Sequence, residues 1–98
     1  MNKDSLPDFS NMVLSIRLID DSHSHDLFNS HFEMQGGRLF LVGTIPEIAT
    51  ESGWNGNQTG AVAWDRVQDY CTFPDMDTYV KAVNKSESIK DNENGKDI

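Results

Sequence analysis

The residues best suited to chemistry by type and spacing lie in one short acidic segment. His23 and His25 are two residues apart, and Asp20, Asp21 and Asp26 surround them. Imidazole and carboxylate groups at close spacing can hold zinc, copper or nickel, so His23 and His25 are the candidate metal ligands. A structural zinc site also needs a second, distant ligand pair at regular spacing, and the sequence has none. The pattern therefore favours a solvated loop, and we expect no metal and no other cofactor.

The other groups that could act as nucleophiles lack the neighbours that such chemistry requires. Cys71 is the single cysteine, and the acidic Asp69 and Asp75 near it in the sequence disfavour a thiolate. A small buried thiol is the favoured interpretation. No Gly-x-Ser-x-Gly turn presents a serine, and Gly36-Gly37 lacks the further glycines and the lysine of a phosphate-binding loop. We expect that the protein is not an enzyme.

Two tryptophans are candidate anchors for a protein partner. Trp64 falls on an apolar stripe and is expected in the core, whereas Trp54 follows a break-forming glycine among asparagines and is expected at the surface. Several carboxylates are close to these rings in the sequence. The predicted partner-binding residues are Trp54, Asp65, Asp69, Asp75 and Asp77.

The net charge of the chain is −8, and most of it lies outside the polar C-terminal segment. Residues 84–98 hold three lysines and four carboxylates, which leaves −7 for residues 1–83, where nearly all the apolar residues are. An acidic folded body repels nucleic acid and anionic lipid and attracts basic surfaces. We therefore expect a basic protein partner, no nucleic acid and no membrane.

Alternating apolar residues predict strands in the first half of the chain. Met12, Leu14, Ile16 and Leu18 share one face at period two over residues 12–19. A second alternating segment around Phe32 and the apolar segment 38–42 lie on either side of Gly36-Gly37. Two strand patterns around a Gly-Gly pair predict a β-hairpin, because glycine accepts positive φ without steric cost.

Helical patterns predominate in the second half. Thr44 and Glu47 form a capping-box pattern with Pro46 between them, which predicts a short helix ending at Gly53. Apolar residues from Ala63 to Cys71 fall at helical spacing and predict a second helix over residues 60–71. Asp75 is expected to cap a last helix that buries Tyr79, Val80 and Val83.

Together these elements predict an α+β fold: a three- to four-stranded antiparallel sheet with two or three short helices packed on one face. The expected organisation is a flexible N-terminal arm at residues 1–10, a single domain at residues 11–84 and a disordered polar tail at residues 85–98. The predicted core consists of Met12, Leu14, Ile16, Leu18, Phe32, Leu39, Leu41, Ile48, Val67, Tyr79, Val80 and Val83.

These observations favour a small acidic protein-binding module that docks on a basic partner, such as a nuclease or another nucleic-acid-binding protein. Its general design is like that of immunity proteins and of proteins that mimic the charge of DNA, although no motif assigns it to either group. The alternative is a helix-turn-helix DNA-binding regulator using residues 45–71, against which the acidic second helix argues. A third class is an enzyme or small-ligand binder with a site lined by the histidine loop. With no secretory signal pattern at the N-terminus, we expect a cytoplasmic protein.

Overall fold

The structure is a computed structural model that describes residues 6–50 and 53–96. It has the α+β class that the sequence predicts. Five strands form one antiparallel sheet, and one α-helix and two short 3-10 turns complete the fold. The elements are β1 (Val13–Leu18), β2 (Ser24–Gln35), β3 (Arg38–Thr44), η1 (Glu47–Ala49), β4 (Thr59–Ala63), η2 (Trp64–Arg66), β5 (Val67–Phe73) and α1 (Met76–Lys96).

The sheet has the strand order β4-β3-β2-β1-β5. Strands β1 to β4 follow one another as neighbours, and β5 then returns to pair with the free side of β1, so that Val13 lies opposite Phe73. The expected count of three to four strands is wrong, and so is the set of two or three short helices on one face. Both errors come from the second half of the chain, where strands replace the predicted helices.

The alternating segments of the first half are confirmed as strands. β1 matches the period-two pattern, with Leu14 and Ile16 almost completely buried on one face. β2 and β3 form the predicted hairpin, in which Gln35 pairs with Arg38 across the Gly-Gly turn. Gly36 and Gly37 have φ values of 59° and 80°, which is the left-handed region that the turn requires.

The helix predicted over residues 60–71 is wrong. This segment forms β4, then the single turn η2, then β5. Trp64 contributes to the core from the turn, while Val62 and Val67 come from the two flanking strands. The single turn η2 shifts the apolar positions between β4 and β5, so that they fall at helix-like intervals in the sequence. This spacing explains the error.

The capping-box helix after Thr44 is also wrong. Thr44 is the last residue of β3 and lies opposite Thr59 of β4. Pro46 has extended backbone angles, and the short turn η1 that follows it has no side-chain cap. Ladder pairing of Thr44 replaces the local capping bond that the pattern offers. The predicted helix therefore shrinks to η1, and its residues 51–52 lie outside the described part of the chain.

One face of the bent sheet encloses the main core. Leu14, Ile16, Leu27, Leu41 and Val62 are buried there together. Aromatic rings close this core at one end. Phe9 lies 6.1 Å from Phe32 and 6.3 Å from Trp64 between ring centroids, and Phe32 meets Trp64 edge-on at 5.0 Å.

The observed core differs from the predicted core in two ways: one residue expected inside is exposed, and one residue expected outside is buried. Ile48 was expected inside, yet it is 38% exposed on η1. Phe9 belongs to the segment expected as a flexible arm, but only 4% of its surface is exposed. The part of that arm before Leu6 lies outside the described residues. Phe9 alternates with no neighbouring apolar residue, so periodicity gave no signal for its burial.

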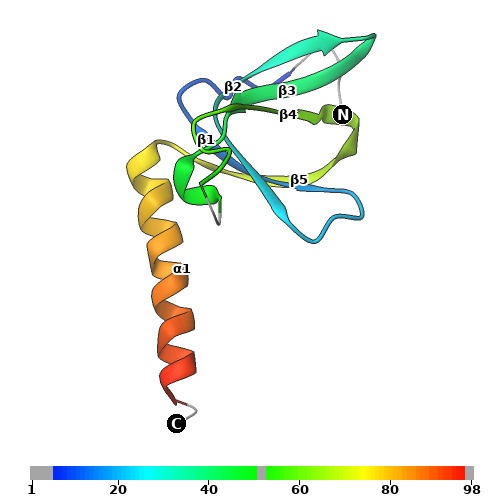
Figure 1. Cartoon of the computed structure of the whole chain (residues 1–98). Coiled ribbons are helices and arrows are strands. Elements are labelled where there is room, and N and C mark those ends of the chain that lie inside the picture. Colours follow the sequence, from blue (N-terminus) through cyan, green and yellow to red (C-terminus); the bar gives the residue numbers. More distant parts are fainter. Residues whose placement is uncertain (1–5, 51–52, 97–98) are drawn as a thin grey trace.

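The other face of the sheet receives the start of α1. Tyr79 is 2% exposed and packs edge-on against Phe73 at 5.4 Å. Beyond this contact α1 projects away from the sheet, and the molecule measures 54 Å along its longest axis (Figure 1). The helix is described as far as Lys96, across most of the segment that composition assigned to a disordered tail.

β2 is shared between two partners, and this creates an opening in the sheet. Residues 24–28 pair with β1, whereas pairing with β3 begins at Phe28 and continues from His31 after an irregularity. Residues 24–27 therefore have β1 on one side and, within the described chain, no strand on the other. The loop that follows β3 lies beside this opening.

Candidate binding site around Trp54

Trp54 stands on a loop that is tied to the end of β3. The backbone N–H of Asn57 donates to the carbonyl of Ile45 at 2.8 Å, and the N–H of Ile45 donates to the carbonyl of Gln58 at 2.9 Å. Gly56 lies against η1 so closely that a Cβ there would be 3.0 Å from atoms of Glu47. These contacts tie residues 56–58 to the end of β3 and to η1, and the nearby Trp54 is 81% exposed. The predicted exposure of Trp54 and the predicted burial of Trp64 are both confirmed.

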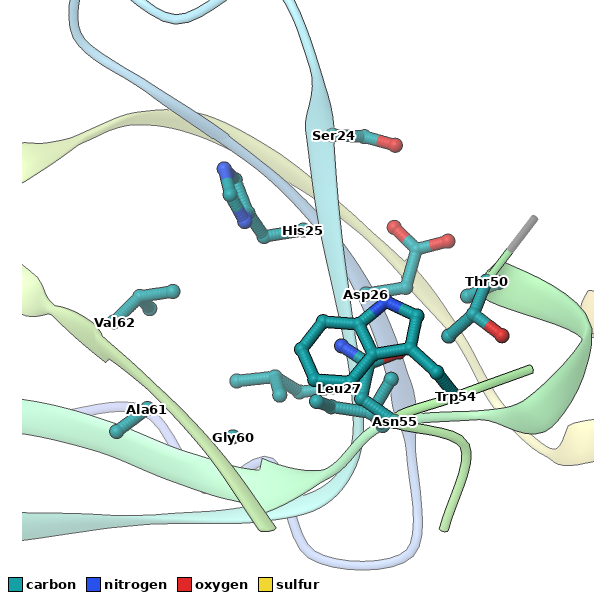
Figure 2. Close-up of a pocket in the computed structure, with 12 residues that line it drawn as sticks. Ser24, His25, Asp26, Leu27, Thr50, Trp54, Asn55, Gly60, Ala61 and Val62 are labelled. Atoms are coloured by element: carbon teal, nitrogen blue, oxygen red, sulfur yellow. The ribbon is translucent and has the colours of Figure 1, made fainter. Parts of the chain in front are cut away.

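A pocket of about 390 Å³ lies beside Trp54, at the opening next to β2 (Figure 2). We call it the Trp54 pocket. It is lined by residues 24–27 of β2, residues 60–62 of β4, and Ile45, Ala49, Thr50, Trp54 and Asn55. Figure 2 shows Trp54, Asn55 and Asp26 gathered at one side of the pocket, with Ala61 and Val62 across from them.

Two buried oxygen atoms of the pocket residues have no hydrogen-bond donor within the described part of the chain. They are Oδ1 of Asp26 and Oδ1 of Asn55. A buried acceptor without a donor costs about 1–3 kcal/mol of stability. Native proteins keep few such atoms, and those that remain call for a specific explanation.

The second carboxylate oxygen of Asp26 is occupied. Tyr79 on α1 donates its hydroxyl to Asp26 Oδ2 at 2.6 Å. Burial of the ring, and then this hydrogen bond and the Asp26 charge, raise the pKa of Tyr79 far above its usual range. The bond fixes the orientation of the carboxylate and joins the helix to the same strand that lines the Trp54 pocket.

The surroundings of the Trp54 pocket carry negative charge. A neighbouring hollow of about 680 Å³ is lined by Glu47 and Ile48 of the loop and by Met76 and Val80 of α1, among others. No lysine or arginine is among the described residues that line either hollow. Two of the predicted binding residues, Asp75 and Asp77, flank Met76 in the sequence. The fold thus brings the first turn of α1 to the loop that carries Trp54.

Asp75 has a structural role as well. Its carboxylate accepts the backbone N–H of Thr78 at 2.7 Å and so caps α1, as the sequence predicts. Hydrogen bonds from the side chain and backbone of Thr78 lower the pKa of Asp75 below its usual value, with a smaller contribution from Lys81. Asp77 lies in the first turn of the helix and is exposed.

The other two predicted binding carboxylates lie elsewhere and have arginine partners. Asp65 on η2 forms an ion pair with Arg38 at 2.7 Å, and this hydrogen bond lowers the pKa of Asp65. Asp69 on β5 pairs with Arg17 of β1. These ion pairs are internal to the molecule, so the four carboxylates do not form one acidic surface.

The histidine segment forms a small hydrogen-bonded corner. Asp21 accepts from the backbone of His23 and contacts Nε2 of His25 at 2.9 Å. The first of these bonds, and then the second, lower the pKa of Asp21. Within the described residues, no group of three or more His, Cys, Asp or Glu side chains is arranged to hold a metal ion.

Cys71 does not have the environment that the sequence predicts. It was expected to be a buried thiol, but it is exposed on β5. Cys71 lies opposite Ser15 of β1, on the face of the sheet that meets α1. It lines a hollow beneath the helix together with Ala82 and Val83. The expectation came from the usual burial of free cysteines, which does not hold for this position on β5.

Sequence reasoning missed Asp26 and Asn55 as site residues. Asp26 was assigned to the strand-breaking acidic segment, although Ser24, Asp26 and Phe28 already alternate as the outer face of β2 does. That period-two pattern was the available signal. No sequence signal indicated Asn55, because its place beside Asp26 depends on how the loop after β3 folds back over β2.

Comparison with known families, curated proteins and solved structures finds no match to this chain. The site must therefore be interpreted from its own residues. Among the helices of the described residues, none combines the length and the apolar character that crossing a membrane requires.

Proposed function

We propose that this protein is a non-enzymatic binding module that docks on a basic partner protein, with Trp54 at the centre of its contact surface. The exposure of Trp54 carries the proposal: 81% of the residue is open to solvent, beside a pocket that contains a carboxylate. Tryptophan is enriched among the residues that dominate binding energy, because it buries a large area and has few rotatable bonds.

The charge distribution supports a basic partner. Arg17 and Arg38 are engaged with Asp69 and Asp65, and Arg66 donates to the carbonyl of Ile19 at 2.9 Å. The carboxylates on the Trp54 side have no such arginine partners among the described residues. An excess of negative charge there attracts a cationic surface and accelerates the encounter.

The same charge argues that the partner is a protein and not a nucleic acid. Phosphate backbones bind to lysine and arginine clusters, whereas this chain has a net charge of −8. The helix-turn-helix alternative also loses its basis, since the described residues between 45 and 71 form strands and 3-10 turns. We propose a cytoplasmic partner, in a compartment where the exposed thiol of Cys71 stays reduced.

A defined basic peptide tests the proposal. We expect a twelve-residue peptide of alternating arginine and glycine to bind the full chain, with an affinity that falls as salt rises from about 20 to about 150 mM. Calorimetry measures the affinity. Trp54→Ala should weaken binding by about tenfold or more, because truncating a central anchor commonly costs at least 2 kcal/mol.

Met34→Ala is the matched control for Trp54→Ala. Met34 is also a large exposed apolar residue, at 62% exposure, but it lies on the β2–β3 hairpin. This variant should bind the peptide as the unmodified chain does. Equal losses in the two variants, or the absence of any binding at the lower salt concentration, would contradict the proposed function.

A further inference from the structure

We propose that the Trp54 pocket receives one arginine side chain of the partner, whose guanidinium donates to Asp26 and Asn55 and stacks on the Trp54 indole. This inference rests on the proposed function and identifies the group that its site recognises. The argument depends on three features of the pocket: its unpartnered acceptors, its fixed carboxylate and its exposed aromatic ring.

The unpartnered acceptors favour a ligand that donates hydrogen bonds. Oδ1 of Asp26 and Oδ1 of Asn55 are both buried, and neither has a donor among the described residues. Both residues line the pocket, and a ligand there reaches the two buried oxygen atoms once the side chains that cover them shift. A ligand with several N–H groups supplies what both atoms lack, whereas a ligand that only accepts hydrogen bonds adds to the penalty.

The Asp26 carboxylate is held in a fixed orientation. Tyr79 holds Oδ2 at 2.6 Å, so Oδ1 is left as the free acceptor of the group. His25, the other titratable residue of the pocket, has its Nε2 engaged by Asp21 at 2.9 Å. The pocket therefore holds a carboxylate with no lysine or arginine among its described lining, which favours a cationic donor.

Arginine fits these features better than lysine does. Its guanidinium is planar, carries five N–H donors in a fixed fork and stacks on aromatic rings, so it can serve both acceptors while covering the indole. Leu27, Ile45 and Val62 provide an apolar wall for the aliphatic part of the side chain. A volume of about 390 Å³ falls within the common range for small-ligand pockets, about 300–1,000 Å³.

Nuclear magnetic resonance with a single-arginine peptide tests the inference. The probe is a capped five-residue glycine peptide with arginine at its centre, compared with the same peptide carrying lysine or the neutral isostere citrulline. We expect the arginine peptide to shift the indole N–H signal of Trp54 and the side-chain amide signals of Asn55. The lysine peptide should bind more weakly, and the citrulline peptide should cause no shift.

Variants of the two acceptors complete the test. Asp26→Asn and Asn55→Leu should each weaken the arginine peptide by about tenfold or more, since removing one partner of a charged hydrogen bond is costly. Because Asp26→Asn also alters the contact with α1, Tyr79→Phe serves as its control. It keeps the carboxylate but removes the bond that orients it, so it should weaken the arginine peptide by less than Asp26→Asn does.

The outcomes separate this inference from the proposed function. If the twelve-residue peptide binds through Trp54, but lysine or citrulline peptides match arginine, the pocket assignment is wrong and the docking surface remains. If Asp26→Asn and Asn55→Leu both bind the arginine peptide as tightly as the unmodified chain, the pocket assignment is likewise wrong. If the twelve-residue peptide does not bind at all, both the inference and the proposed function fail.

Discussion

Asp26 links two parts of the molecule through its two oxygen atoms. One oxygen accepts the Tyr79 hydroxyl of α1, and the other is a buried acceptor among the residues of the Trp54 pocket. A change at the helix contact therefore affects the orientation of a group that we assign to binding. The sequence predicted the exposure of Trp54, whereas the contact between Asp26 and Tyr79 exists only after α1 packs against the sheet.

The Tyr79 hydroxyl provides a prediction at this residue scale. Tyr79→Phe should reduce the free energy of unfolding by about 1–2 kcal/mol, because it leaves Asp26 Oδ2 without its donor. The pH dependence has a defined sign. Since the folded state raises the pKa of Tyr79 above its ordinary value of 10.0, the bond contributes fully below pH 10 and is lost as the pH rises further.

Urea unfolding at pH 7 and at pH values above 10 measures this contribution. The unmodified chain should lose stability more steeply above pH 10 than the Tyr79→Phe variant does. Absorbance titration of the tyrosines should show one ionisation at unusually high pH that the variant lacks. Parallel stability curves for the two proteins above pH 10 would be inconsistent with the buried hydrogen bond.

At the scale of elements, the sequence predicted strands correctly where the local pattern was not opposed by pairing with distant residues. β1 and the β2–β3 hairpin follow from period-two alternation and from the Gly-Gly pair. Prediction failed where a local pattern competed with long-range pairing. Thr44 offers a helix cap but pairs with Thr59, and β5 pairs with β1, whose residues lie 49 to 60 positions earlier in the chain. The spacing of apolar residues within 60–71 does not show which distant strands this segment pairs with.

The Gly36-Gly37 turn is the clearest place to test an element. Both glycines have positive φ, and an added Cβ would meet no atom within 4 Å at either position. Any penalty is therefore conformational and not steric crowding. Gly37→Val should reduce the free energy of unfolding by about 1 kcal/mol or more, because a β-branched residue resists positive φ.

Gly36→Asn is the matched control for this substitution. Asparagine tolerates positive φ, and Asn-Gly is a preferred two-residue hairpin turn, so stability should change little. Thermal unfolding of the two variants gives the comparison. Equal melting temperatures would mean that the turn geometry does not depend on glycine at position 37.

At the scale of the whole molecule, the net charge divides into two kinds of carboxylate. Asp65 and Asp69 are neutralised locally by Arg38 and Arg17, and they connect elements of the sheet. The carboxylates near Trp54 and the start of α1 lack arginine partners among the described residues. The sequence could supply the total charge but not this division, because the ion pairs join residues that are 27 and 52 positions apart.

This division predicts that equal changes in net charge have unequal effects on binding. Asp77→Asn and Asp65→Asn each remove one negative charge. Asp77 lies in the first turn of α1, whereas Asp65 pairs with Arg38 next to the hairpin turn, which extends away from the helix (Figure 1).

Charges are screened over about 8 Å at physiological salt, so only those near the contact surface influence the bound state. Asp77→Asn should therefore weaken the twelve-residue arginine peptide more than Asp65→Asn does, as measured by calorimetry at about 150 mM salt. Equal weakening would show that the peptide responds to overall charge, and the contact surface around Trp54 would then have to be abandoned.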